Sequence, residues 1–237
     1  MDVKKILAVA TAVVGTVAMA DIVSSSVVGY QNITGKTGFT MMTPTFVGIG
    51  ADYSIQDIKL NGAMGMGTET IQFIDADGNT LESYTYFDEM IMGVTGWYDN
   101  SSMLATRLVD PAESFLVSND AGSYTIQVAG QVDYDGIPAL DGLAGFTSVG
   151  NMTPIAKDIQ KFALTGAMGM GTETLQFVDE NGNSPESYIW FDEMIMGVTG
   201  WYDSSSLLAD REIGAGEGFM IGNDAGNYTI AVPGTND

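Results

Sequence analysis

The sequence predicts an all-β protein of two tandem, homologous domains, each a β-sandwich or a small β-barrel, behind an N-terminal signal peptide. Three observations lead to this prediction: a charged and apolar leader, an internal repeat of domain size, and short strand-like segments between turn residues. We expect a signal peptide at residues 1–20, a first domain at 21–130 and a second domain at 131–237.

The first twenty residues have the features of a secretory signal peptide. Lys4 and Lys5 precede an apolar stretch at residues 6–17, and an Ala-Met-Ala cleavage site ends at Ala20. The apolar stretch is shorter than the roughly 20 residues that a membrane-spanning helix needs. We therefore expect cleavage after Ala20 and a secreted mature chain, periplasmic or extracellular, that is not inserted in a membrane.

An internal repeat accounts for most of the mature chain. Residues 62–130 align without a gap onto residues 166–234, with 46 of 69 positions identical, and the string FDEMIMGVTGWYD occurs in both copies. A repeat of this length is a domain rather than the shorter unit of a solenoid. Two such domains would present the same surface twice.

Local patterns within the repeat are those of strands. Four runs of the first copy are short, rich in β-branched and aromatic residues, and separated by turn residues. They are residues 70–74, 83–87, 114–117 and 124–128. In the last run, apolar residues alternate with Thr125 and Gln127, which predicts one buried and one wet face. The mature sequence lacks a long apolar period near 3.6, so any helices should be short.

Composition excludes several classes of function. The chain has 30 Asp and Glu against 8 Lys and Arg, a formal net charge of −22, and neither Cys nor His. Its field repels nucleic acids and anionic membranes, so we expect no nucleic-acid partner. Without Cys, stability must come from burial alone. Without His, the commonest general base is missing, so we expect no enzyme and no cofactor.

Two acidic turns resemble the first half of a calcium-binding loop, at residues 75–79 and 179–183. The twelfth position of such a loop would be Tyr86 or Trp190, and neither can supply the bidentate carboxylate. A D-G or N-G pair between two strands is instead a strong hairpin signal. We expect hairpin turns and assign no metal site, with calcium as the alternative if acids elsewhere complete the coordination.

Methionine occurs in four pairs with one intervening residue: Met64/Met66, Met90/Met92, Met168/Met170 and Met194/Met196. Thioethers are soft ligands that suit Cu(I), but the chain has no His or Cys to complete a copper site. On a strand, this spacing places both side chains on one face. We therefore expect the methionines to fill a core.

Trp97, Tyr98, Trp201 and Tyr202 are the candidate ligand-binding residues. Each pair lies in the string Gly-Trp-Tyr-Asp. Exposed aromatic rings beside acids and amides can stack on sugar rings. The same residue types also fill β cores, in which case the neighbouring Asp would cap a turn. The sequence leaves both interpretations open.

One acidic pair and one basic position recur in both copies. Asp88 and Glu89 recur at positions 192 and 193, and neighbouring acids on a strand point to opposite faces, so they predict no catalytic dyad. The recurring basic residues are Arg107 and Arg211, for which we expect ion pairs with Glu113 and Glu217.

The strings SSSVVGYQN and GFTMMTPTFVG, followed by DADGN, GWYD and GEGF elements, resemble a group of uncharacterised secreted proteins of verrucomicrobial and related bacteria. The resemblance covers nearly the whole chain. It implies export and a β-rich fold and brings no activity with it.

These observations predict an exported, non-enzymatic structural or interaction protein of the cell envelope or extracellular matrix. Its duplicated surfaces would serve self-association or bind an extracellular glycan or protein partner. The alternative is a carbohydrate-binding module that uses exposed Trp and Tyr, with calcium as a helper.

Overall fold

The computed structural model describes residues 28–48, 52–120, 122–132, 137–224 and 226–236. Within them the chain is all-β, with several antiparallel sheets and no closed barrel, which confirms the all-β class and removes the barrel alternative. The α-helices of this part of the chain are four residues long, as the missing 3.6-residue period predicts. The expected signal peptide at residues 1–20 lies outside the described residues.

The larger sheet of the first half has five antiparallel strands in the order β2-β7-β4-β5-β6. They are β2 (Gly38–Met42), β7 (Phe115–Asn119), β4 (Met66–Ile74), β5 (Thr80–Phe87) and β6 (Gly96–Tyr98). The expected strands at 70–74, 83–87 and 114–117 correspond to β4, β5 and β7. Their β-branched and aromatic residues suit a pleated, half-buried surface.

The smaller sheet of the first half has the order β1-β8-β3. Its strands are β1 (Val28–Gly35), β8 (Tyr124–Gln131) and β3 (Lys59–Asn61). In β8, Tyr124, Ile126 and Val128 are buried, whereas Thr125 and Gln127 are partly exposed. This alternation confirms the fourth predicted strand, because successive side chains of a strand point to opposite faces.

The second half has the same arrangement of equivalent strands. Its larger sheet has the order β10-β17-β13-β14-β15, its smaller sheet the order β12-β18-β9, and β11 and β16 form a separate pair. The bounds are β9 (Leu140–Gly142), β10 (Gly145–Gly150), β11 (Lys157–Asp158), β12 (Leu164–Thr165), β13 (Met170–Phe177), β14 (Glu186–Phe191), β15 (Gly200–Tyr202), β16 (Glu212–Ile213), β17 (Gly218–Asn223) and β18 (Tyr228–Ile230).

Each half has a buried core to which both of its sheets contribute. In the first core, Phe115 of the larger sheet and Ile126 of the smaller sheet are fully buried, and their counterparts in the second core are Phe219 and Ile230. Burying one side chain of this size contributes about 1.5–3 kcal/mol. The two clusters therefore supply the stability that a chain without disulfides needs.

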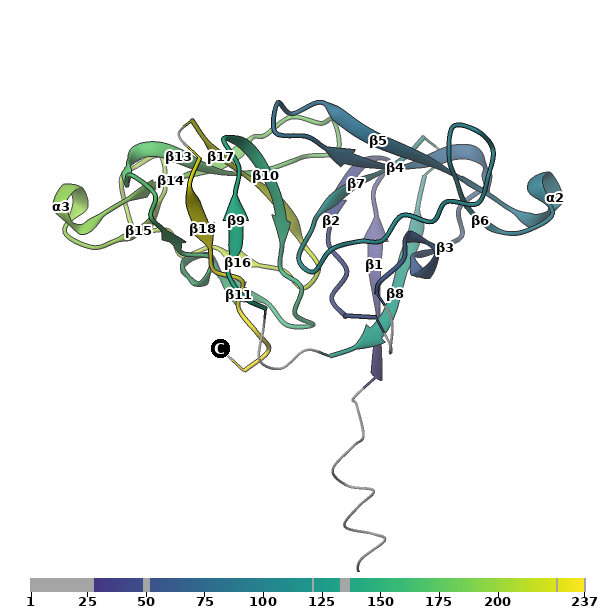
Figure 1. The fold of residues 1–237 in the computed structure, drawn as a ribbon, viewed down its shortest axis with the longest axis horizontal. Coiled ribbons are helices and arrows are strands. Elements are labelled where there is room, and N and C mark those ends of the chain that lie inside the picture. Colours follow the sequence, from purple (N-terminus) through teal and green to yellow (C-terminus); the bar gives the residue numbers. More distant parts are fainter. Residues whose placement is uncertain (1–27, 49–51, 121, 133–136, 225, 237) are drawn as a thin grey trace, which may run out of the picture.

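The two halves contact each other through reciprocal main-chain hydrogen bonds. Phe39 N donates to Glu180 O at 3.0 Å, and Phe146 N donates to Ala76 O at 2.8 Å. Thus the β4–β5 turn of the first half meets the start of β10, and the β13–β14 turn of the second half meets the start of β2. The halves lie side by side along the longest axis of the molecule (Figure 1).

A second pair of reciprocal main-chain bonds also joins the halves. Thr43 N donates to Gly216 O, and Gly150 N donates to Ala112 O, both at 3.0 Å. Thr43 is fully buried there. Equivalent donors and acceptors on both sides give the contact the local two-fold character of a symmetric dimer interface. It therefore holds the outer ends of the two halves on opposite sides of the molecule.

Replacing Gly38 by Ala tests the contact between the halves. Gly38 has a φ of +86°, and a Cβ added there would lie 2.0 Å from Glu180 O. Gly93→Ala is the matched control, because its φ is +81° but nothing lies within 4 Å. We expect the control to lose about 1–2 kcal/mol of unfolding free energy from backbone strain, and Gly38→Ala to lose distinctly more in urea titrations. Equal losses would contradict the contact.

Candidate functional site

Exposed apolar side chains gather at both ends of the molecule. At the first end they surround the short helix α2 (Glu89–Met92), and at the second end they surround α3 (Glu193–Met196). We define the first end surface as Met64, Met66, Met90, Ile91 and Val94. The second end surface is Met168, Met170, Met194, Ile195 and Val198. Each of these ten side chains is between 51% and 86% exposed.

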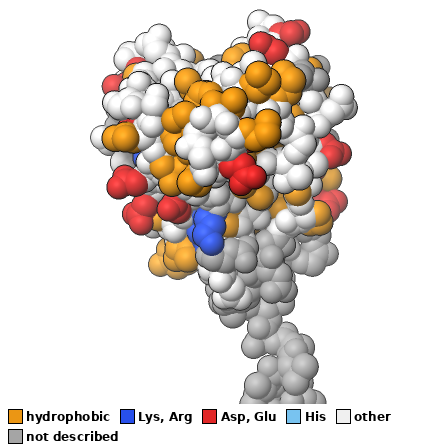
Figure 2. Space-filling view, turned by 90° about the vertical axis from the view of Figure 1, so that its left-hand side faces the viewer, with side chains coloured by type: hydrophobic (Ala, Val, Ile, Leu, Met, Phe, Trp, Pro, Cys, Tyr) orange, Lys and Arg blue, Asp and Glu red, His pale blue; other side chains and the backbone are white. Residues whose placement is uncertain are grey.

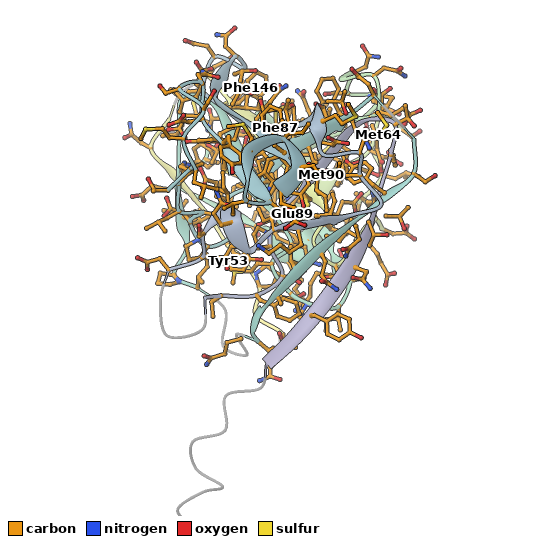
Figure 3. The ribbon with its side chains drawn as sticks, turned by 90° about the vertical axis from the view of Figure 1, so that its right-hand side faces the viewer. Tyr53, Met64, Phe87, Glu89, Met90 and Phe146 are labelled. Atoms are coloured by element: carbon orange, nitrogen blue, oxygen red, sulfur yellow. The ribbon has the colours of Figure 1, made fainter. Side chains whose placement is uncertain are left out.

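The two end surfaces face in opposite directions, because α2 and α3 lie at opposite ends of the longest axis (Figure 1). Figure 3 looks onto the first end, with Met90 and Glu89 on α2 and with Met64 and Phe87 beside it. Figure 2 looks onto the second end and shows hydrophobic side chains gathered around one acidic side chain. Further acidic side chains lie toward the rim, and a basic side chain lies below.

Helix α2 is held by polar contacts of its main chain, and none of its residues is buried. Asp88 Oδ1 accepts hydrogen bonds from Met90 N at 2.9 Å and from Ile91 N at 3.2 Å. Gly93 ends the helix in the left-handed conformation, and its N donates to Glu89 O. So short a helix is unstable alone, so its caps are what keep its apolar side chains pointing into solvent.

The methionine loop at residues 62–66 is attached directly to this helix. Asp88 N donates to Gly65 O at 2.9 Å, and Glu89 N donates to Thr95 Oγ1 at 3.1 Å. The first of these bonds places Met64 and Met66 beside α2. The loop and the helix therefore form one end surface.

A buried carboxylate holds the methionine loop from below. Glu69 on β4 is fully buried, and its Oε1 accepts a hydrogen bond from Met64 N at 2.8 Å, while its Oε2 has no hydrogen-bond partner among the described residues. Glu173 and Met168 form the same pair in the second half. Burial of a carboxylate is costly. Its presence under both loops indicates a role in positioning them.

A buried tryptophan anchors the strand that follows each helix. In the first half, Trp97 Nε1 donates to Ile58 O at 2.9 Å. The side-chain amide of Gln56, in the 3-10 turn η1 (Ile55–Asp57), bonds to both main-chain groups of Trp97 and to Ala105 O. The end surface thus projects from a rigid, fully buried base.

The second half repeats this anchor. Trp201 Nε1 donates to Phe162 O at 3.0 Å, and Gln160, in the 3-10 turn η2 (Ile159–Lys161), bonds to Trp201 and to Ala209 O. The two end surfaces therefore have the same kind of buried anchor as well as the same apolar side chains.

The charge around the first end surface is negative. Asp88, Glu89 and Asp99 lie in the chain segment that forms it, and the sequence has no Lys or Arg between residues 60 and 106. The second end has Asp192, Glu193 and Asp203, with no Lys or Arg between residues 162 and 210. Chemically, the arrangement offers an adaptable apolar contact with an acidic border.

The four aromatic candidates lie in the cores and are not on the end surfaces. Trp97 and Trp201 are 0% exposed, and Tyr98 and Tyr202 are 5% exposed. Rings buried to this degree offer no face for a sugar to stack on, so the structure favours the core interpretation of these residues. The neighbouring Asp99 caps a turn, as that interpretation predicts, by accepting from Ser101 N and Met103 N.

The expectation that the methionine pairs fill a core is wrong. Three of the four paired methionines in each half belong to the end surfaces, and Met90 is the most exposed of them at 86%. Met64 lies in a loop before β4, and Met90 and Met92 lie on a helix. The reasoning from strand spacing therefore did not apply to these pairs.

The acidic pair also lies outside a strand. Asp88 is the N-cap of α2 and Glu89 is its first residue, with the same arrangement at Asp192 and Glu193. An Asp at an N-cap bonds to the main chain of the first turn. Asp88 is therefore a structural residue that shapes the end surface.

The two acidic turns are hairpin turns, as predicted. Asp75 Oδ1 accepts from Asp77 N and Asn79 N, and Gly78 has a φ of +82°. Asp179 makes the same contacts with residues 181 and 183. In the described part of the chain, no group of three or more acidic residues has the arrangement of a metal site.

The predicted ion pairs of the two arginines are confirmed. Arg107 contacts Glu113 at 2.6 Å and Glu82 at 2.9 Å, and its guanidinium lies over the ring of Phe73. Burial and a hydrogen bond to Glu82 raise the pKa of Tyr84 to about 12, so the Tyr84 hydroxyl stays protonated and donates to this network. Arg211 is paired in the same way with Glu217 and Glu186 in the second half.

Sequence reasoning missed the end surfaces, although their signal is present. An Asp two residues before a Met-Ile-Met run and a Gly directly after that run are the two caps of a one-turn helix. A helix of that length cannot bury three consecutive apolar residues on one face. Reading the caps would therefore have predicted their exposure.

Comparisons with protein-family models, with curated proteins and with solved structures found no match for this chain. Within the described residues, no helix combines the length and the apolarity needed to cross a bilayer.

Substitutions at Trp97 and Met90 should differ greatly in their effect on stability. Trp97→Ala removes a fully buried ring and its hydrogen bond, so we expect a loss of about 3–5 kcal/mol in the free energy of unfolding. Met90→Ser changes an exposed side chain and should alter it by less than about 0.5 kcal/mol. Chemical denaturation measures both. A large effect of Met90→Ser would show that Met90 is packed in solution.

Glu69→Ala should loosen one methionine loop without affecting the other. The substitution removes the acceptor for Met64 N, so we expect faster amide hydrogen exchange at Met64 and a loss of about 1–3 kcal/mol in stability. Glu173→Ala is the matched control and should act at Met168 instead. Unchanged exchange at Met64 would rule out the positioning role of Glu69.

Proposed function

We propose that this chain is an exported, non-enzymatic structural or interaction protein of the cell envelope or extracellular matrix, and that its two end surfaces are its binding surfaces. In this proposal the signal peptide is residues 1–20 and two homologous domains, 21–130 and 131–237, arose by tandem duplication. The observation that carries the proposal is the pair of equal apolar surfaces at opposite ends of one molecule.

Soluble proteins rarely expose large contiguous apolar patches, and where such a patch is exposed it often marks an interaction site. A Met at 86% exposure contributes little to stability, so replacement by a polar residue would cost the fold almost nothing. The two copies differ at 23 of 69 aligned positions, and at none of the five positions of the end surface. Retention of apolar residues at tolerant positions supports a function in binding.

The placement of the two surfaces adds a second argument. Reciprocal hydrogen bonds between the halves hold them in one pose, so the surfaces cannot both meet the same small partner at once. A molecule with one binding surface at each end can link two partners or bind a repetitive structure with avidity. This is the geometry expected of a linking protein in an envelope or a matrix.

The carbohydrate-binding alternative has less support. It requires exposed Trp and Tyr side chains, and the four candidates from the sequence, Trp97, Tyr98, Trp201 and Tyr202, are buried. The aromatic ring with a large exposed area on β1 is Tyr30, which has no aromatic partner at stacking distance among the described residues.

A photo-crosslinking amino acid placed at position 90 or at position 194, in cells that express the full chain, tests the proposal. We expect both positions to yield adducts with the same partner, identified by mass spectrometry, and a mature chain that begins at Asp21. Position 30 is the control, because Tyr30 is 71% exposed and its strand, β1, lies away from both α2 and α3 (Figure 1). Different partners from the two ends, or adducts equal to those of the control, would contradict equivalent binding surfaces.

A further inference from the structure

We propose that each end surface binds a cationic amphipathic segment of a partner protein, so that one chain holds two such segments. The proposal rests on the proposed function and adds the chemistry of the partner. Two properties of the end surfaces carry it: apolar side chains of high adaptability, and a border in which acidic side chains outnumber basic ones.

The apolar part of the surface is built for an irregular apolar partner. Three of its five side chains are methionines, which are unbranched and polarizable and can adjust to different shapes. Met64 and Met66 extend from a loop, while Met90 and Ile91 extend from the adjoining helix, and all four are more than half exposed. Apolar residues along one face of a helix or an extended segment would bury these side chains.

The charged part of the surface favours a partner of positive charge. Glu89 is exposed within the first end surface, and Asp88 and Asp99 lie in the same segment. Of the two cations nearest in sequence to the first end surface, Arg107 is paired with glutamates, and Lys59 Nζ donates to Gln56 O. Beside the second end surface, the nearest cation in sequence on the N-terminal side is the exposed Lys161. Lys or Arg side chains of a partner would therefore find carboxylates available beside the apolar contact.

The same charges disfavour the other occupants. A second copy would bring the acidic borders of two end surfaces together, since both borders have the same sign and each chain has a formal net charge of −22. Nucleic acids and anionic membranes are repelled for the same reason. A partner that combines an apolar face with positive charge gains from both parts of the surface.

Titration calorimetry with designed peptides tests the proposal. The ligand is a helical peptide of about 18 residues with Leu on one face and Lys on the other. Two control peptides separate the contributions: one has Glu in place of Lys, and one keeps the composition but scatters Leu around the helix. We expect two equivalent sites per chain, a dissociation constant on the order of micromolar, weaker binding at high salt, and little binding of either control.

Surface variants locate the sites. Met90→Ser combined with Met194→Ser should weaken binding at both sites by about tenfold, and Met90→Ser alone should leave one site unchanged. Glu89→Gln combined with Glu193→Gln should mainly reduce the dependence of binding on salt. Tyr30→Ser is a surface control that should change nothing, and thermal melting checks that every variant is folded.

Each alternative outcome overturns the proposal in a recognisable way. If the peptide with scattered Leu binds as tightly as the amphipathic peptide, the attraction comes from overall charge alone. If the methionine substitutions leave binding unchanged, the peptide binds outside the end surfaces. If the Glu peptide binds as tightly as the Lys peptide, the end surfaces do not select a positively charged partner. If light scattering shows that the chain self-associates, and Met90→Ser combined with Met194→Ser abolishes this, the end surfaces bind a second copy of the chain. In that last case the proposed function stands and only the cationic partner is lost.

Discussion

The burial of one tryptophan in each half is the interaction on which the rest of the structure depends. Trp97 and Trp201 are fully buried, and their rings pack against Tyr86 and Trp190 with centroids 5.0 and 5.1 Å apart. Their indole N–H groups are bonded to main-chain carbonyls, so burial leaves no polar group unpaired. In a chain without cysteine, this packing fixes the strand that follows each end helix.

Close to this anchor in the sequence, some apolar residues are buried in the core and others are exposed to solvent. Met90 and Trp97 belong to the same repeated string, yet one is 86% exposed and the other is fully buried. The caps Asp88 and Gly93 cause the difference, because they form a single helical turn that leaves the sheet and returns to it. Hydrophobicity alone cannot distinguish the two roles, since both residues are apolar and neither lies in a periodic pattern.

The contact between the halves fixes one end surface at each end of the molecule. Each half lends a hairpin turn to the other, through Ala76 and Glu180, and the glycines that receive them have left-handed backbones that leave room for a carbonyl. The acidic turns thereby acquire a structural role in joining the halves. Because the contact is reciprocal, the two end surfaces are equivalent and point away from each other, which is the basis of the proposed binding at both ends.

The sequence by itself determined the all-β class, the four strands of the repeat, the hairpin turns and one ion-pair partner of each arginine, because turn residues, alternation and charge act over short distances. The second partners, Glu82 and Glu186, are 25 residues away in the chain and came only from the fold. The sequence also left open whether Trp97 and Tyr98 are core residues or ligand contacts. Only the tertiary structure decided that they are buried and that the halves join through their hairpin turns. Those outcomes depend on which sheet covers which face, and residues far apart in the chain set that.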